Sequence, residues 1–331
     1  MQHLHIYSKQ TPELIERLAR TPAMLRLADV GMHCGCEYSG NPLYAQAAEP
    51  YSRLSHSIGV AGIVWDFTGD IHQAVAGLLH DISTPVFAHT IDFMNGDHIA
   101  QESTEASTAA FIESSKEIIS LLRERSIRVE DVCDYHRYPV ADNDTPMLSA
   151  DRLEYTIGNA CSIYHEPIGL LREIYDDLTV ATNESGTEEL CFRSLEHALR
   201  FARIALRNSR FYVTDEDRYN MQFLAEIIRS ALDAGVIEPG DLHTTEREVI
   251  GKLKRDAGTC KAWEEYCAIS EVSSSAEMPE GRRAYKVFAK KRYIDPLVTT
   301  AGGSIRVSQA DDAMRGEIEF FLATDFDKWV Y

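Results

Sequence analysis

The sequence predicts a mainly helical protein with a smaller C-terminal part that combines helix and strand. Apolar residues recur at helical spacing over most of the first 255 residues, and alternating strand patterns are scarce there. The polar stretches Ser273-Ser274-Ser275 and Pro279-Glu280-Gly281 mark a change, after which alternating patterns begin. A chain of 331 residues is long enough for one large or two moderate domains with a sizeable core.

These patterns place the elements in order along the chain. A first helix is expected around Leu14, Ile15 and Leu18, after the start signal Thr11-Pro12. Further helices are expected over 57–67, 71–80, 99–125, 148–164, 190–206, 215–234 and 244–254. In the C-terminal part, strands are expected over 285–290, 304–308 and 317–321.

The charge balance excludes one class of partner. Lys and Arg number 33 against 52 Asp and Glu, a net charge of −19. Because duplex nucleic acid is bound through cationic contacts to phosphate, we expect no such partner. No run approaches the roughly 20 apolar residues that a membrane span requires. The N-terminus also lacks a signal pattern, so we expect a cytoplasmic protein without a membrane partner.

The seven cysteines are predicted to be reduced thiols, because they are odd in number and widely spread. The stretch His33-Cys34-Gly35-Cys36 could bind zinc. A zinc knuckle needs a second, distant Cys/His pair, however, and none is obvious. Ordinary thiols are therefore the preferred interpretation.

Two histidines and two aspartates stand out as candidate metal ligands. His80 and Asp81 end an apolar run, and Pro85 supplies a helix break that lets both side chains face one ion. His56 precedes a glycine-punctuated apolar helix, and Asp151 starts another apolar segment. This nitrogen and oxygen set suits one divalent ion, which could be Mn, Fe, Ni, Co, Zn or Mg. Each residue taken alone is more simply explained as a helix cap or a satisfied polar contact.

Four motifs then resemble a known family, the HD-domain metal-dependent phosphohydrolases with their H…HD…D signature. They are Arg53-x-x-His56-Ser57-x-Gly59-Val60, Gly77-Leu78-Leu79-His80-Asp81, Pro85-x-Phe87-x-His89 and Ala150-Asp151-Arg152. Their order and flanking residues are most similar to the dNTP triphosphohydrolase (dGTPase-like) branch, over roughly residues 25–165. The stretch 290–298 resembles the C-terminal lobe of that branch more weakly.

The resemblance implies an HD-domain helical bundle and a role for each matching residue. His56, His80, Asp81 and Asp151 would hold the metal, and Arg53, Arg152 and Tyr155 would contact substrate phosphates. An ion pair with a carboxylate ligand is the alternative for Arg53. The implied organisation is an N-terminal helical segment (1–50), an HD domain with the metal site (51–180), a helical extension (181–275) and a C-terminal lobe with strands (276–331).

The sequence departs from the branch at three positions. Thr84 occupies a position where the branch commonly has a second histidine, and Gln101 one where a histidine often supplies a proton. Asn159 occupies a position where an aspartate would be expected to recognise the sugar hydroxyl. The missing histidines argue against a second metal ion. Asn159 stays a candidate for substrate binding.

The acid that protonates the leaving group must then come from another residue. His89, Asp92 and His98 are the candidates, and His89 with Asp92 is preferred because residues three apart share a helix side. A structural histidine that caps the turn after Pro85 is the alternative for His89. Solvent exposure after the turn signal Asn95-Gly96-Asp97 is the alternative for His98.

Three functions stay open. The first is hydrolysis of a nucleotide, with a deoxynucleoside triphosphate as the leading substrate. The second keeps the metal site for a nucleoside monophosphate, a cyclic nucleotide or another phosphorylated metabolite. The third is a nucleotide-sensing or assembly protein with weak or no turnover. The departures from the branch at Thr84, Gln101 and Asn159 suggest this function. We also expect a homo-oligomer.

The C-terminal part contains a run of basic residues. Arg282, Lys286, Lys290 and Arg292 would share one face at strand spacing. A solvated face is the simpler interpretation. The alternative is that this face meets an anionic ligand or the acidic body of a neighbouring subunit.

Overall fold

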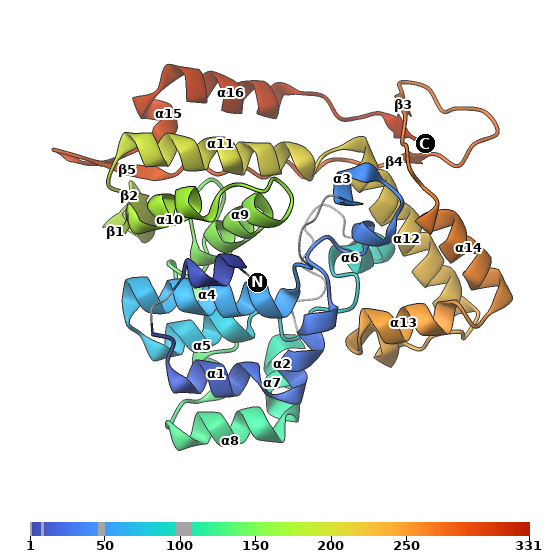
Figure 1. The fold of residues 1–331 in the computed structure, drawn as a ribbon, viewed down its shortest axis with the longest axis horizontal. Helices are drawn as coiled ribbons and strands as arrows, with labels where there is room; N and C mark the ends of the chain where they lie inside the picture. Colours follow the sequence, from blue (N-terminus) through green and yellow to red (C-terminus); the bar gives the residue numbers. More distant parts are fainter. Residues whose placement is uncertain (1, 8–9, 46–49, 97–106) are drawn as a thin grey trace.

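A computed structural model describes residues 2–7, 10–45, 50–96 and 107–331. Its body is a set of packed helices, and the C-terminal chain runs along one side of that body (Figure 1). The helices are α1 (Glu13–Ala19), α2 (Pro22–Leu25), α3 (Pro42–Ala45), α4 (Arg53–Thr68), α5 (Ile71–Leu79), α6 (His89–Asn95), α7 (Thr108–Ser114), α8 (Lys116–Glu124), α9 (Ala150–Ser162), α10 (Ile168–Asp176), α11 (Leu195–Phe211), α12 (Asp215–Asp233), α13 (Glu246–Leu253), α14 (Ala257–Cys267), α15 (Val307–Ala310) and α16 (Asp312–Ala323).

The strands form two small sheets. The first has the order β1 (Leu178–Thr182), β2 (Glu188–Phe192), β5 (Leu297–Thr300) and β6 (Gly303–Arg306). β1 and β6 are antiparallel to their neighbours, whereas β2 and β5 run parallel, with Cys191 opposite Leu297. The second has the order β3 (Ser274–Ser275), β7 (Trp329–Val330) and β4 (Tyr285–Lys286). The mainly helical fold with a smaller α+β part is confirmed.

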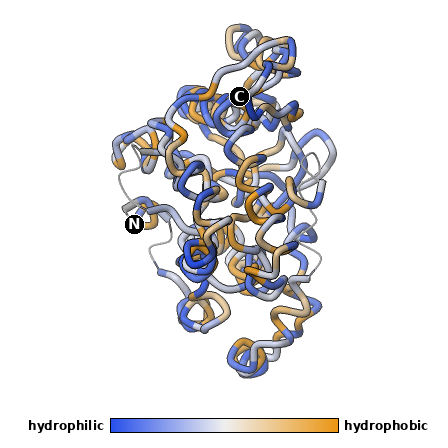
Figure 2. Tube along the Cα trace, turned by 90° about the vertical axis from the view of Figure 1, so that its right-hand side faces the viewer, coloured by the Kyte–Doolittle hydropathy of each residue, from blue (hydrophilic) through white to orange (hydrophobic). Residues whose placement is uncertain are grey.

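The core is built from α4 and α5, which lie side by side with α9 next to α4 (Figure 1). Ser52 caps α4, Gly69 ends it with a φ of 62°, and Asp70 at once caps α5 by accepting from the amides of His72 and Gln73. A turn this tight forces α5 to fold back on α4. Hydrophobic and hydrophilic stretches alternate along the helices (Figure 2), as expected for helices with one buried face.

Several expected elements differ in the structure. The expected helix over 190–206 begins instead as strand β2, whose Leu190, Cys191 and Phe192 are fully buried, and the helix starts only after Ser194 caps it. The expected strand over 317–321 is part of helix α16, because Met314, Ile318 and Phe321 form its buried face at helical spacing.

For two further elements, the predicted lengths of the helix or strand were wrong. Ser115 divides the described part of the expected helix 99–125 into α7 and α8, and the amide of Ile118 donates to its hydroxyl. The expected strand over 285–290 is paired only at Tyr285 and Lys286. The four basic residues of that region therefore do not share one strand face: Arg282 and Lys286 are exposed, whereas Lys290 and Arg292 line a cavity.

The described residues contain no helix long and apolar enough to span a membrane. All seven cysteines are free, and Cys34, Cys36 and Cys191 are buried. Burial raises the pKa of the Cys34 thiol to about 12, so this thiol stays protonated and is a poor nucleophile.

Candidate metal centre

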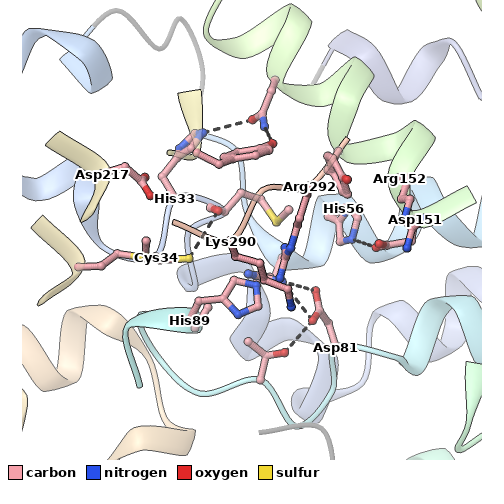
Figure 3. A pocket seen from close by; sticks show the side chains of 18 of the residues that line it. His33, Cys34, His56, Asp81, His89, Asp151, Arg152, Asp217, Lys290 and Arg292 are labelled. Atoms are coloured by element: carbon pink, nitrogen blue, oxygen red, sulfur yellow. Dashed lines mark hydrogen bonds and ion pairs between the residues drawn. The ribbon is translucent and has the colours of Figure 1, made fainter. Parts of the chain in front are cut away.

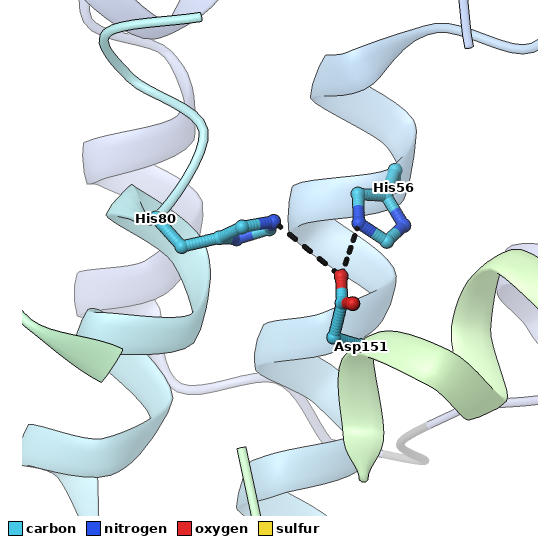
Figure 4. Close-up of side chains that lie close together, drawn as sticks. All are labelled: His56, His80 and Asp151. Atoms are coloured by element: carbon cyan, nitrogen blue, oxygen red, sulfur yellow. Dashed lines mark hydrogen bonds and ion pairs between the residues drawn. The ribbon is translucent and has the colours of Figure 1, made fainter. Parts of the chain in front are cut away.

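His56, His80 and Asp151 converge from three helical segments on one point (Figure 4). One donor atom of each lies within 4.8 Å of the others, and this is the one such group of His, Cys, Asp or Glu found among the described residues. His56 Nε2 lies 2.9 Å from Asp151 Oδ1, and His80 Nε2 lies 3.7 Å from the same oxygen. The spacing suits ligands arranged around a single ion.

Asp81 lies beside this group. One of its oxygens is 3.5 Å from His80 Nε2, and the carboxylate accepts from Arg53 Nη1 at 3.2 and 3.3 Å. Thr84 Oγ1 donates to it at 2.7 Å. Burial would raise the pKa of Asp81, but the charges of Arg53, His80 and His56 and the hydrogen bond from Thr84 together outweigh burial and lower it, so a carboxylate faces the centre. Thr84, which departs from the family pattern, thus orients a candidate ligand.

Glu154 fixes the ring of His56 from behind. This fully buried carboxylate accepts from His56 Nδ1 at 2.5 Å, from His3 Nε2 at 3.0 Å and from the hydroxyl of Tyr51. A carboxylate on one ring nitrogen sets the tautomer and leaves the other nitrogen to bind metal. Gly59 of α4 makes room for it, because a Cβ there would lie 2.5 Å from Glu154 Cγ.

His80 is oriented by the backbone. Its Nδ1 donates to the carbonyl of Gly77 at 2.7 Å, and its Nε2 is directed toward Asp151. Both histidines are therefore held with Nε2 toward Asp151.

The electrostatics favour a cation at this point. Burial lowers the pKa of His56, but the hydrogen bonds that its ring donates to Asp151 and Glu154, with the charges of these carboxylates, outweigh this effect and raise it to about 10. The same negative field favours a divalent ion, which displaces the proton. The residues present therefore fit the one divalent ion that the sequence predicts.

The centre forms part of a cavity of about 540 Å³ (Figure 3). The cavity is also lined by the predicted residues His89, Arg152, Tyr155 and Asn159. Two segments beside the cavity have residues with a positive φ. They are Cys34 (φ 58°) and the pair Phe87 and Ala88 (φ 59° and 41°), which directly precede His89. Such conformations cost energy and cluster at functional sites.

Arg53 is well placed to meet an anion. Its side chain is buried, and one nitrogen pairs with Asp81, as the alternative for this residue predicts. Its Nε is buried without a hydrogen-bond partner among the described residues. An unsatisfied buried donor is costly, and Arg53 is also one of the residues that line the cavity.

His89 and Asp92 form the expected pair. His89 Nδ1 lies 2.9 Å from an oxygen of the fully buried Asp92. Burial and the charges of Arg292 and Arg53 lower the pKa of His89, so its ring is neutral at pH 7. The roles of both residues stay predictions.

The other predicted residues have different surroundings. Arg152 donates to the carbonyl of Met147 at 2.8 Å, so it supports its own loop as well as lining the cavity. Asn159 bonds His33 at 3.2 Å and donates to the hydroxyl of Tyr212. The prediction for His98 and the departure at Gln101 lie outside the described residues.

Sequence reasoning missed His3, Tyr51 and Glu154 behind the ligands and Tyr212 in the cavity wall, and it considered His33 only as part of a possible zinc knuckle. A signal existed for Glu154, because it follows Asp151 by three residues and so shares its side of α9. No local pattern connects His3 or Tyr212 to the centre.

The fold and the centre together define a helical protein in which His56, His80 and Asp151 converge on one candidate metal site, with Asp81 beside them. No family model matches the sequence. The chain is 25% identical over 268 residues to the uncharacterized protein YdhJ of Bacillus subtilis, covering 80% of this chain and 79% of that protein. It is 23% identical over 259 residues to the metal-dependent phosphohydrolase cns2 of Cordyceps militaris, covering 76% of this chain and 72% of that protein.

Two solved structures share the fold. A hypothetical protein from Aquifex aeolicus has a TM-score of 0.65 at 17% identity, covering 97% of this chain and 92% of its own. A phosphohydrolase from Bacteroides thetaiotaomicron has a TM-score of 0.64 at 15% identity, covering 97% and 96%. Along most of its length the chain is therefore similar to a metal-dependent phosphohydrolase, and its fold is that of a solved phosphohydrolase.

Proposed function

We propose that this protein is a metal-dependent phosphohydrolase of the HD type that acts on a nucleotide, with a deoxynucleoside triphosphate as the leading substrate. The observation that carries the proposal is the convergence of His56, His80 and Asp151 beside Asp81 in the wall of a cavity. The similarity to a metal-dependent phosphohydrolase supports it.

Each residue has a definite task in this proposal. His56, His80, Asp81 and Asp151 hold the ion, which when bound acts as a Lewis acid and lowers the pKa of a water molecule. The guanidinium of Arg53 contacts the phosphoryl oxygens and offsets the charge that develops on them.

The reaction also needs a proton for the leaving group. Hydrolysis joins the oxygen of water to phosphorus and breaks the bond from phosphorus to the leaving oxygen, which takes up a proton. We assign that transfer to His89, whose Nδ1 is fixed by Asp92. The ring is neutral at pH 7 in the free protein, so it must gain a proton as the anionic substrate binds and raises its pKa.

A substrate panel tests the proposal. Metal-free protein is supplied with Mn²⁺, Fe²⁺, Ni²⁺, Co²⁺, Zn²⁺ or Mg²⁺ and incubated with nucleoside mono- and triphosphates, cyclic nucleotides and p-nitrophenyl phosphate. Release of inorganic triphosphate supports the leading substrate, whereas orthophosphate points to a phosphatase.

Asp151→Ala and its control Asp176→Ala complete the test. Asp151→Ala is expected to abolish turnover, and Asp176→Ala, which removes an exposed carboxylate at the end of α10, is not. Equal activity of wild type and Asp151→Ala would contradict the proposal. Saturable nucleotide binding without any product would favour the sensing function instead.

A further inference from the structure

The turn that leads into His89 has an unfavourable backbone conformation. Phe87 and Ala88 directly precede His89 at the start of α6, and their φ values are 59° and 41°. Residues with a Cβ keep such conformations only where the surrounding structure holds them. The contacts that hold this turn therefore decide where the ring of His89 lies.

Two of these contacts come from a remote part of the chain, at the start of helix α13. The amide of Val86 donates to the carbonyl of Leu242 at 2.8 Å. The amide of Phe87 donates to Oε1 of Glu246, the first residue of α13, at 3.3 Å. Glu246 is only 1% exposed, and 159 residues separate it from Phe87. The turn into α6 is thus held from outside the cavity.

The same oxygen of Glu246 holds a second segment of the cavity wall. The amide of Gly31 donates to Oε1 at 3.0 Å, and the next three residues, 32–34, line the cavity. This segment also lies beside the start of α4, because the amide of Arg53 donates to the carbonyl of Val30 at 2.9 Å. One buried carboxyl group therefore joins the turn into α6 to the segment beside the start of α4.

Gly31 allows the acidic side chains to approach the backbone. A Cβ at this position would lie 1.8 Å from Glu37 Oε1 and 3.7 Å from Glu246 Oε2. Burial and the charge of Glu37 raise the pKa of Glu246 to about 7. The hydrogen bonds from the two amides need only an acceptor oxygen, which the carboxyl group has with or without its proton. The contact with both segments therefore does not depend on the charge of Glu246.

A further contact joins the same two segments on the other side of His89. The hydroxyl of Thr90, which is fully buried in α6, donates to the carbonyl of Cys34 at 2.8 Å. The ring of His89 lines the cavity between these two contacts, with its Nδ1 2.9 Å from Asp92 (Figure 3). The backbone before and after His89 is thus tied to residues 31–34.

We propose that Glu246 is a positioning residue for His89. By accepting hydrogen bonds from the amides of Phe87 and Gly31, it fixes the turn that presents the histidine to the cavity. The inference rests on the proposed function for the task of His89, whereas the positioning itself requires no turnover. It extends the functional part of the chain to α13, which has no residue in the cavity lining.

Three substitutions of Glu246 separate hydrogen bonding from charge. Glu246→Met removes the acceptor, and Glu246→Asp draws the carboxylate back by one methylene group. Glu246→Gln keeps an acceptor oxygen at full length without the charge. Glu246→Met is expected to lower kcat about 10- to 100-fold, because a misplaced proton donor loses much of its effect. Glu246→Asp is expected to lower kcat by a smaller factor, and Glu246→Gln to recover most of it. KM and the metal affinity are expected to change less than kcat, since Glu246 contacts neither the cavity nor a metal-ligand candidate.

The pKa of His89 is a readout that a merely structural role would not move. In the wild type, burial and the charges of Arg292 and Arg53 outweigh the hydrogen bond to Asp92 and lower this pKa. If the turn relaxes, the ring moves toward solvent, and its pKa rises toward the ordinary value of about 6.5. Loss of the negative charge of Glu246 would by itself lower the pKa of His89, so a rise cannot come from charge alone.

NMR of the metal-free protein measures this pKa. The Cε1–H signal of His89, assigned with His89→Gln, is followed against pH in each variant. Glu246→Met and Glu246→Asp are expected to raise the pKa of His89, whereas Glu246→Gln is expected to leave it at or below the wild-type value.

Two controls perturb the same region without releasing the turn. Tyr38→Phe removes the hydrogen bond that the tyrosine hydroxyl donates to Glu246 Oε2 at 2.7 Å, but it leaves both amides with their acceptor. Leu253→Ala opens space behind a fully buried side chain at the end of α13. Both controls are expected to lower the melting temperature while keeping the wild-type kcat and His89 pKa.

The outcomes separate this inference from the proposed function. If nucleotides are hydrolysed but folded Glu246→Met keeps the wild-type kcat and His89 pKa, the inference is wrong and the hydrolase function stands. If Glu246→Met does not fold, the same two measurements on Glu246→Asp decide. An equal loss of kcat in all three variants with an unchanged His89 pKa would also overturn the inference. If no substrate is turned over but the pKa of His89 rises in Glu246→Met and not in Glu246→Gln, the positioning role stands and the hydrolase function falls.

Discussion

Replacing Glu154 by glutamine tests how the metal centre is built. The carboxylate lies behind the ligands and accepts from His56 Nδ1 at 2.5 Å, from His3 Nε2 at 3.0 Å and from Tyr51. Burial raises its pKa, but the hydrogen bonds from the two histidines outweigh burial and lower it. The side chain is thus an anion, and Glu154→Gln removes its charge without changing its shape.

The two orientations of the new amide set the size of the effect. With its oxygen toward His56, the tautomer is kept and only the charge is lost, which weakens the ring as a ligand. With its nitrogen toward His56, the proton moves to Nε2 and opposes metal binding. Losing such a partner typically costs about 10- to 100-fold in metal affinity, or about 1.4 to 2.7 kcal/mol.

The assay is calorimetric titration of metal-free protein with Mn²⁺ and Zn²⁺, with the melting temperature measured alongside. Glu189→Gln is the matched control, because Glu189 is also fully buried but pairs with Arg306, which is not part of the cavity lining. The amide oxygen of glutamine can still accept from the Leu148 amide that precedes Asp151, so this variant is expected to lower stability without changing metal affinity. Wild-type metal affinity in a folded Glu154→Gln variant would refute the reasoning.

Three further predictions concern the ligands, the lobe and pH. Removing Asp151 with alanine is expected to lower metal affinity at least about 100-fold, since it deletes a ligand and not its support; unchanged calorimetry would disprove this role. Arg306→Met leaves the buried Glu189 without its cation and is expected to lower the free energy of unfolding, measured by urea denaturation, by about 3 kcal/mol. The control Arg315→Met removes an exposed arginine of α16 and is expected to lower it by less than about 1 kcal/mol. Burial raises the pKa of Asp217 to about 7, so its contribution is present below about pH 4 and is lost as the pH rises to 7. Asp217→Asn is therefore expected to gain stability over wild type across that range, by at most about 4 kcal/mol, and a pH-independent difference in urea denaturation would count against it.

The sequence allowed the helical body to be predicted where local signals agree with the tertiary structure. The helices expected over 57–67 and 71–80 correspond to α4 and α5, although α4 begins four residues earlier, at Arg53, after the cap Ser52 that the prediction did not use. The prediction was wrong for β2, since three consecutive apolar residues are compatible with a buried helix or a buried strand. It was wrong for α16 as well, because Phe320 is 72% exposed and mimics an alternating pattern.

The residues of the candidate site also divide into those that the sequence could identify and those that it could not. Arg53 and His56 could be grouped from the sequence because they belong to one motif of the resembled family, and in the structure both lie on α4. His3, His33 and Tyr212 reach the site only through tertiary packing, so no local pattern identifies them. The domain boundaries and the expected homo-oligomer stay predictions.

The cavity depends on contacts that tie the C-terminal lobe to the loop before α9. The amide of Leu148 donates to Glu189 at 2.9 Å, and the same carboxylate accepts from Arg306 of β6. The amide of Asp295 donates to the carbonyl of Pro146 at 2.9 Å. The loop that leads into Asp151 and the segment that carries Lys290 are thus fixed to one another, although they are far apart in sequence. Because ordering a segment costs about 1 to 2 kcal/mol per residue, these contacts order this wall of the cavity before a ligand arrives, and the ligand does not have to supply that free energy.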